Sequence, residues 1–201
     1  MPMPSFETLG AIIIFAAAAS WTPGPNNVML ASSGATFGLS RTWPHIFGVT
    51  IGFSLMVFAI ALGLGEVFRN EPALRIVISW TGFAVMLYLA YRIGTQSARP
   101  AKAAARPLSF WSAAAFQWVN PKAWVMTTAA AATYVSGQHP TMDAATIAVI
   151  FLLVGLTSTT TWAAAGASLA ALLGRGWRLV AFNATMALLL ALSALWLVIG
   201  G

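Results

Sequence analysis

Long apolar runs, separated by short polar stretches, divide this chain into six segments. A membrane-spanning helix needs about 20 mainly apolar residues to cross a hydrocarbon core about 30 Å thick. Every run reaches that length, so the pattern predicts an all-α protein that crosses a membrane six times. The runs are Phe6 to Phe37, Trp43 to Leu64, Leu74 to Ile93, Phe110 to Val135, Ala144 to Leu173 and a last one from Arg178 to Gly200.

The first and fourth runs each contain a proline within a polar break. The first break reads Trp21-Thr22-Pro23-Gly24-Pro25-Asn26-Asn27, and the second reads Val119-Asn120-Pro121-Lys122. Proline cannot continue a regular helix, because it lacks an amide hydrogen and clashes with the preceding turn. Non-helical backbone at membrane depth is tolerated only where it is buried in protein or lines a wet cavity. Both breaks therefore predict a site between half-helices.

The residues of the breaks suit a zwitterionic ligand. Pro25 and Pro121 fit the first turn of a half-helix, where asparagine side chains satisfy free amides. Each half-helix N-terminus carries about half a positive charge, and Lys122 adds a full one beside the second break. Carbonyls freed around Ala19 to Thr22 and Phe116 to Val119 are potential acceptors for an ammonium. The candidate substrate-binding residues are Trp21, Pro23, Gly24, Pro25, Asn26, Asn27, Trp118, Asn120, Pro121 and Lys122.

Structural roles for the same residues remain open alternatives. The asparagines would act only as caps, Lys122 would extend to a membrane interface, and Trp21 and Trp118 would only pack. The run from Thr157 to Thr161 either lines the path or bonds to carbonyls one turn back. His45 and His139 receive no role.

Composition agrees with a membrane domain covering residues 1–201. The chain is 59% hydrophobic and only 7% charged, whereas soluble domains average about 25% charged residues. The net charge of +6 resides largely in short loops, which is typical of topology signals and not of nucleic-acid binding. The chain has no cysteine, which excludes thiol and disulfide chemistry. We expect no cofactor and no metal.

Lysine and arginine positions predict the orientation in the cell (inner) membrane. Cytoplasmic loops hold more of these residues than outer loops do. If the N-terminus is extracytoplasmic, only two arginines, Arg69 and Arg75, lie on the outer side, together with all four acidic residues. The same orientation places seven lysines and arginines on the cytoplasmic side, namely Arg41, Arg92, Arg99, Lys102, Arg106, Arg175 and Arg178. Both termini are therefore predicted to be extracytoplasmic.

The two halves of the chain resemble each other weakly but in the same order. Val28-Met29 follows Trp21 at the distance at which Val125-Met126 follows Trp118, and Gly48-Val49-Thr50 resembles Gly155-Leu156-Thr157. A unit of three spans is odd, so the second copy must insert inverted. The predicted repeats are residues 1–95 and 108–201, joined by a linker at 96–107. Inverted repeats with interrupted helices point to a transporter.

A small-residue face is visible on the second run. Gly48 and Gly52 lie four residues apart, beside Thr50 and Ser54. This spacing predicts close packing against another helix.

These motifs resemble the LysE/RhtB family of amino-acid exporters. The similarity lies in Thr22-Pro23-Gly24-Pro25-Asn26-Asn27, in Asn120-Pro121-Lys122-Ala123 and in the third span from Gly82 to Tyr91. The resemblance implies six transmembrane helices in two inverted three-helix repeats, efflux of amino acids, and coupling to the proton-motive force. Many relatives have an acid where this chain has Asn26.

The sequence as a whole predicts an exporter of neutral amino acids such as homoserine, threonine or leucine. An exporter of basic amino acids or of another small solute or ion, and a passive channel, are the alternatives. An integral membrane enzyme or a metal exporter would need clustered titratable groups inside the membrane, and the apolar runs offer essentially Lys122. The expected partners are an amino-acid substrate, the lipid bilayer and possible further copies of the chain in a homo-oligomer.

Overall fold

The computed structural model describes residues 5–96, 106–136, 138–173 and 176–199, and the elements in these ranges are all helical. The interruptions leave most of the predicted linker, together with Arg99, Lys102 and Arg175, outside the described residues. The helices are α1 Phe6–Trp21, α2 Pro25–Phe37, α3 Leu39–Ala59, α4 Gly65–Asn70, α5 Pro72–Gln96, α6 Phe110–Phe116, α7 Pro121–Tyr134, α8 Pro140–Leu173 and α9 Trp177–Ile199.

The predicted first break is confirmed. Helix α1 ends at Trp21, and α2 restarts at Pro25 after a bend of 58°. Pro25 occupies the first position of α2, where its missing amide hydrogen costs nothing. Helix α2 ends at Phe37 and is followed by Gly38, whose φ of 78° is a conformation that favours glycine.

The second break is also confirmed and is more gradual. Helix α6 passes into a 3-10 turn at Gln117–Val119, and α7 restarts at Pro121. Asn120 between them is extended, with φ −85° and ψ 111°. The proline that follows it disfavours a helical conformation at this position.

Two predicted connections differ from the structure. The second apolar run was expected to begin at Trp43, but α3 already begins at Leu39, because the positive φ of Gly38 redirects the chain within one residue. The stretch between the second and third runs, which was left outside both, is largely the short helix α4. It follows a π-helical turn at Ile60–Leu64 that contains Gly63 at φ 120°.

Four helices among the described residues are long and apolar enough to cross a membrane. They lie within Leu39–Leu64, Pro72–Thr95, Pro140–Leu172 and Trp177–Leu195, and the bent pair α1–α2 is a possible fifth. The pair α6–α7 is not among them. An all-helical membrane fold is thus confirmed, whereas the count of six spans stays a prediction.

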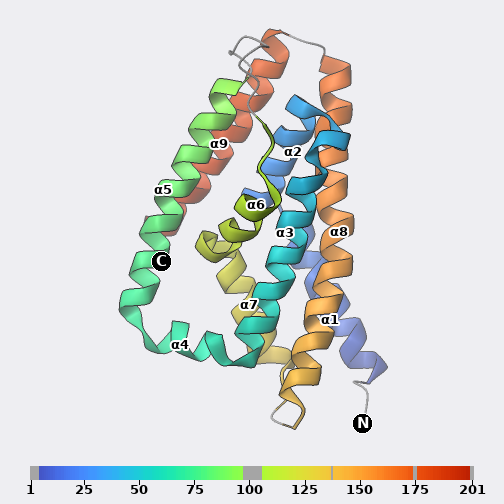
Figure 1. Cartoon of the computed structure of the whole chain (residues 1–201), viewed down its shortest axis with the longest axis vertical. Coiled ribbons are helices and arrows are strands. Elements are labelled where there is room, and N and C mark those ends of the chain that lie inside the picture. The colour runs from blue at the N-terminus through green and yellow to red at the C-terminus, as the bar shows by residue number, and fades with distance from the viewer. Residues whose placement is uncertain (1–4, 97–105, 137, 174–175, 200–201) are drawn as a thin grey trace.

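The half-helices α2, α6 and α7 pack between the long helices, whereas α1 lies at the margin beside α8 (Figure 1). Helix α8 contacts α1, α2 and α3, while α5 and α9 pair along one side. Helix α1 lies on α8, and α6 lies on α3. Helices α1 and α6 begin the two predicted repeats, and α3 and α8 are the second spans of those repeats. Each repeat therefore packs its first half-helix on the second span of the other repeat.

Glycines allow these contacts to be close. A Cβ atom on Gly34 of α2 would lie 1.9 Å from the Ala163 carbonyl oxygen of α8, and one on Gly166 equally near the Ala31 oxygen. Gly48 and Gly52 of α3 face α6 in the same way, with the Phe110 oxygen 2.4 Å from a Cβ on Gly48. The predicted packing face on α3 is therefore confirmed.

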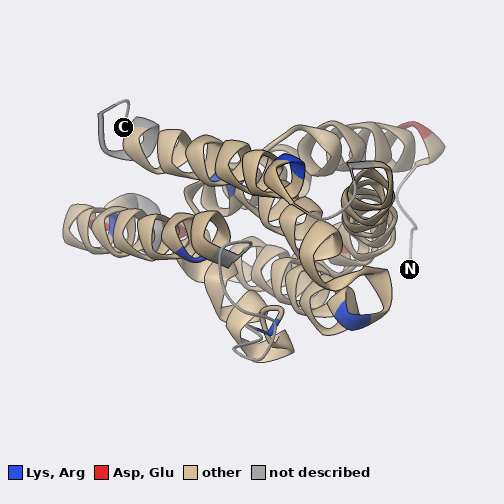
Figure 2. Cartoon of the chain, turned by 90° about the horizontal axis from the view of Figure 1, so that it is seen from above, with Lys and Arg blue, Asp and Glu red and all other residues tan. Residues whose placement is uncertain are grey.

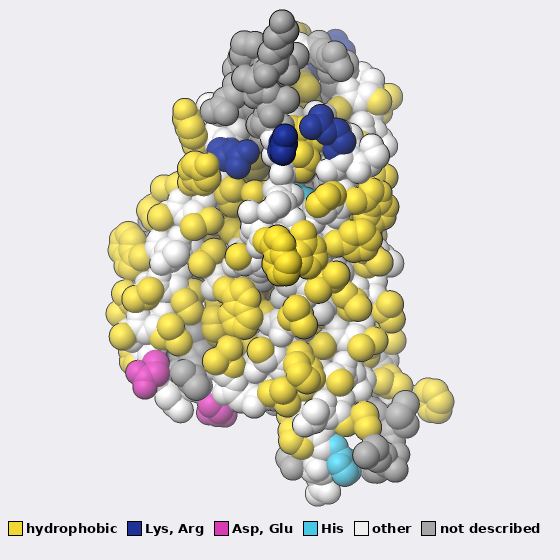
Figure 3. Space-filling model, in the orientation of Figure 1, with side chains coloured by type: hydrophobic (Ala, Val, Ile, Leu, Met, Phe, Trp, Pro, Cys, Tyr) yellow, Lys and Arg dark blue, Asp and Glu magenta, His cyan; other side chains and the backbone are white. Residues whose placement is uncertain are grey.

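Charges gather at the two ends of the long axis. Figure 3 shows Lys and Arg side chains near one end, Asp and Glu near the other, and a wide hydrophobic band between them. Seen from above, the Lys and Arg positions are spread over several helices (Figure 2). An apolar band between polar ends is the surface expected of a membrane-spanning protein.

Candidate functional site

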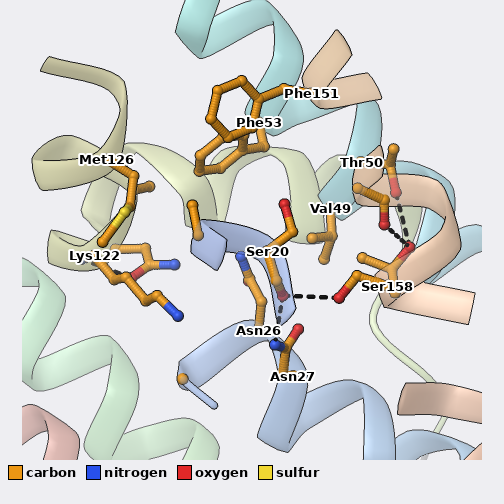
Figure 4. Close-up of a pocket in the computed structure, with 16 residues that line it drawn as sticks. Ser20, Asn26, Asn27, Val49, Thr50, Phe53, Lys122, Met126, Phe151 and Ser158 are labelled. Atoms are coloured by element: carbon orange, nitrogen blue, oxygen red, sulfur yellow. Dashed lines mark hydrogen bonds between the residues drawn. The ribbon is translucent and has the colours of Figure 1, made fainter. Parts of the chain in front are cut away.

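A cavity lies between the two breaks and is closed on its far side by α3 and α8 (Figure 4). It leaves about 60 Å³ for the centres of water-sized molecules, which is room for several waters. Its lining comprises Ala19, Ser20, Gly24, Asn26, Asn27, Val49, Thr50, Phe53, Asn120, Lys122, Ala123, Met126, Phe151, Gly155, Ser158 and Thr159.

Lys122 connects the second break to the first. Its Nζ donates to the Thr22 carbonyl at 2.7 Å and lies 3.4 Å from the Pro23 carbonyl. The side chain is half-buried and passes over Gly24, where a Cβ atom would lie 2.9 Å from Lys122 Cδ. In this conformation the ammonium therefore reaches inward to the first break, and Gly24 provides the space.

Asn27 closes the C-terminal end of α1. Its Nδ2 donates to the carbonyls of Ser20, at 2.8 Å, and Thr22, at 3.0 Å. Ser158 Oγ also donates to the Ser20 carbonyl, at 2.7 Å. These two carbonyls, which we expected to accept a substrate ammonium, thus each receive two protein donors. A carbonyl oxygen has two lone pairs, so an incoming ammonium must displace a donor.

Asn26 joins the breaks through Gln117, a residue that sequence reasoning missed. The two side-chain amides pair reciprocally: Asn26 Nδ2 donates to Gln117 Oε1 at 2.8 Å, and Gln117 Nε2 donates to Asn26 Oδ1 at 3.2 Å. Gln117 is fully buried and also donates to the Ala113 carbonyl. Gln117 could have been noticed in the sequence as a polar residue inside an apolar run, next to the second break. Its partner, however, is 91 residues away and could not be identified from the sequence.

The two half-helix N-termini differ in their caps. Asn120 Oδ1 accepts from the Lys122 amide at 3.1 Å, so the capping interpretation holds for Asn120. Helix α2 begins after Gly24, and no side chain of the described residues caps it. Asn26 and Asn27 lie in its first turn beside the cavity. The uncapped amides of α2 and the Lys122 ammonium are therefore neighbouring positive groups.

The far wall combines hydroxyl and aromatic groups. Thr50 and Thr159 are hydrogen-bonded at 3.1 Å, and the rings of Phe53 and Phe151 are 5.4 Å apart. The run from Thr157 to Thr161 divides between the cavity and its own helix. Ser158 and Thr159 line the cavity, while Thr157 and Thr161 donate to carbonyls of their own helix.

Five of the candidate residues lie outside the cavity lining. Pro23, Pro25 and Pro121 shape the breaks without facing the cavity. Trp21 is 44% exposed. Trp118 packs edge-on against Trp124, with ring centroids 6.1 Å apart, and its carbonyl accepts from Trp124 Nε1. None of the described residues that line the cavity is acidic.

Comparison with known proteins identifies the family of the chain. The LysE type translocator family matches residues 17–201. The chain is 29% identical over 160 residues to the cysteine/O-acetylserine efflux proteins of Escherichia coli strain K12 and Shigella sonnei, covering 79% of this chain and 82% of each relative. No solved structure matches the chain significantly. The chain therefore belongs to the LysE type translocator family of amino-acid exporters, and it is a transporter and not an enzyme.

Proposed function

We propose that this protein exports neutral amino acids, or close analogues such as O-acetylserine, across the cell membrane. The observation that carries the proposal is the pairing of an uncapped helix end with Lys122 at a cavity whose described lining contains no acid. The efflux relatives are named for cysteine and O-acetylserine, and neither substrate has a cationic side chain. A second cationic group on the substrate would have no partner in this lining.

The substrate carboxylate is assigned to the α2 N-terminus. The first-turn amides of α2 and the dipole of the helix favour an anion there. Lys122 Nζ lies within hydrogen-bonding distance of Thr22, three residues before the start of α2. A carboxylate between the helix end and this ammonium would receive charge-assisted hydrogen bonds from both.

The substrate ammonium is assigned to the carbonyls of the first break. When Lys122 turns from the Thr22 carbonyl to the substrate carboxylate, that oxygen loses one of its two donors. The freed lone pair then accepts the substrate ammonium. Substrate binding thus exchanges one protein hydrogen bond for two bonds to the zwitterion, and it loosens the link between the breaks.

Transport requires the cavity to open to each side in turn. Its present space of about 60 Å³ is small, so we assign the structure to a nearly closed conformation. We further propose six spans in two inverted repeats, with residues 96–107 as a cytoplasmic linker and the proton-motive force as the driving force. The exchanged contacts of α1 on α8 and α6 on α3 support the repeat.

An export screen tests the proposal. Cells with and without the protein are loaded with dipeptides, and the efflux of each released amino acid is followed. We expect faster efflux of threonine, homoserine or leucine, and a collapse of uphill efflux when an uncoupler removes the proton gradient. Efflux of lysine well above these neutral amino acids would overturn the substrate assignment.

Counterflow separates a carrier from a passive channel. Proteoliposomes are filled with unlabelled substrate and diluted into a trace of labelled substrate. A carrier accumulates the label transiently above its external concentration, because internal substrate returns the binding site to the outside. Simple equilibration of the label would instead indicate a channel.

A further inference from the structure

His45 is a buried polar side chain to which the proposed mechanism assigns no role. It lies near the start of α3 and is 1% exposed. Neither Nδ1 nor Nε2 of its ring has a hydrogen-bond partner among the described residues. Buried polar atoms almost always have partners, so an orphaned imidazole points to a ligand or to water.

A second cavity adjoins this imidazole. It is bounded by α2, α3, α5 and the segment 106–108, and it leaves about 30 Å³ for the centres of water-sized molecules. That space holds about two waters, or a carboxylate group. His45 lies one helical turn from Val49, which lines the central cavity. The two cavities therefore follow each other along α3.

The second cavity carries positive charge. Arg92 of α5 and Arg106 both line it, and none of its described lining residues is acidic. Its two serines are engaged: Ser32 Oγ donates to Asn183 Oδ1 at 2.9 Å, and Ser33 Oγ lies 3.3 Å from Thr42 Oγ1. The other polar side chains in its described lining are the His45 imidazole and the two guanidiniums. This donor set matches a carboxylate, which guanidinium groups bind through two parallel hydrogen bonds.

We propose that His45, Arg92 and Arg106 form a second site, which binds the carboxylate of an amino acid before it enters the central cavity. The site lies toward the end of the molecule where the Lys and Arg side chains gather (Figure 3). That this carboxylate belongs to the transported substrate rests on the proposed function. That the site binds a carboxylate does not rest on it, so carboxylate binding and export are tested separately.

Histidine NMR tests the site directly, because the chain has two histidines. His139 is exposed and immediately precedes α8, far from α3 in sequence, and serves as the internal reference. The full-length protein, labelled with ¹⁵N in its histidine rings and held in phosphatidylcholine nanodiscs, is titrated with acetate. Acetamide, which has the same shape without the charge, is the matched ligand. We expect saturable shifts of the His45 ring signals with acetate alone, and unchanged His139 signals.

Charge-removing variants then identify the partners. Arg92→Gln and Arg106→Gln should each weaken acetate binding roughly tenfold, since a lost charge-assisted hydrogen bond is worth about that much. Arg75→Gln removes the same charge from the other end of α5 and should leave binding unchanged.

Three results would overturn the site. The His45 signals do not shift with acetate, they shift equally with acetamide, or they shift only when phosphatidylglycerol replaces the neutral lipid and not when acetate is added. The last result would assign the cavity to an anionic lipid headgroup. If acetate binds but no amino acid is exported, the site stands and the proposed function fails. If amino acids are exported but acetate does not bind at His45, the proposed function stands and the second site is wrong.

Discussion

At the scale of single residues, the proposed role of Lys122 in substrate binding can be tested by substitution. Its ammonium links the two breaks through the Thr22 carbonyl and is proposed to exchange onto substrate. Lys122→Met should lower export at least tenfold at matched membrane abundance. Thermal stability should change little, because loss of one charge-assisted hydrogen bond is offset by removal of the desolvation cost of a half-buried charge.

Lys122→Arg is the matched control for charge. It should recover little export, because a guanidinium is a larger planar fork and the side chain already passes within contact distance of Gly24. Normal export by Lys122→Met would remove Lys122 from the site. Full recovery by Lys122→Arg would indicate that only a positive charge near the breaks is needed.

At the scale of helices, the crossing of α2 and α8 is the least tolerant contact. A Cβ atom on Gly34 or Gly166 would lie 1.9 Å from a carbonyl oxygen of the facing helix. Because the obstacle is backbone, the helices themselves must separate. Gly34→Ala and Gly166→Ala should each destabilise the protein by about 2 kcal/mol or more, seen as a lower midpoint of thermal unfolding in detergent.

Gly10 provides the control for this prediction. It lies within α1, and a Cβ atom there would meet nothing within 4 Å. Gly10→Ala should leave the thermal midpoint unchanged or raise it slightly, because alanine favours a helix over glycine. Equal midpoints for all three alanine variants would argue against the close crossing of α2 and α8.

At the scale of the whole molecule, the charge asymmetry predicts topology. An alkaline phosphatase fusion after Gly201 should be active, since the enzyme folds outside the cytoplasm, and one within the linker 98–106 should be inactive. A fluorescent-protein fusion at each point should give the opposite pattern. If both points prove cytoplasmic, the second half contains an even number of spans, and the inverted repeat is wrong.

The positions of the breaks and the helical class could be predicted from local chemistry. Proline removes a donor and restricts its predecessor wherever it stands, and about 20 apolar residues favour a membrane helix in any context. The breaks before Pro25 and Pro121, the small-residue face at Gly48 and Gly52, and the Asn120 cap follow from such rules.

Which side chains meet across the molecule was decided by tertiary packing. Asn26 was expected to cap α2 or bind substrate, but it pairs with Gln117, and Asn27 instead closes the end of α1. Lys122 reaches carbonyls about 100 residues away, and His45 is buried with no partner among the described residues, in a cavity that two arginines also line. Hydrogen bonds act over about 3 Å, so they depend on how the half-helices are bent and crossed. No local pattern in the chain specifies that geometry.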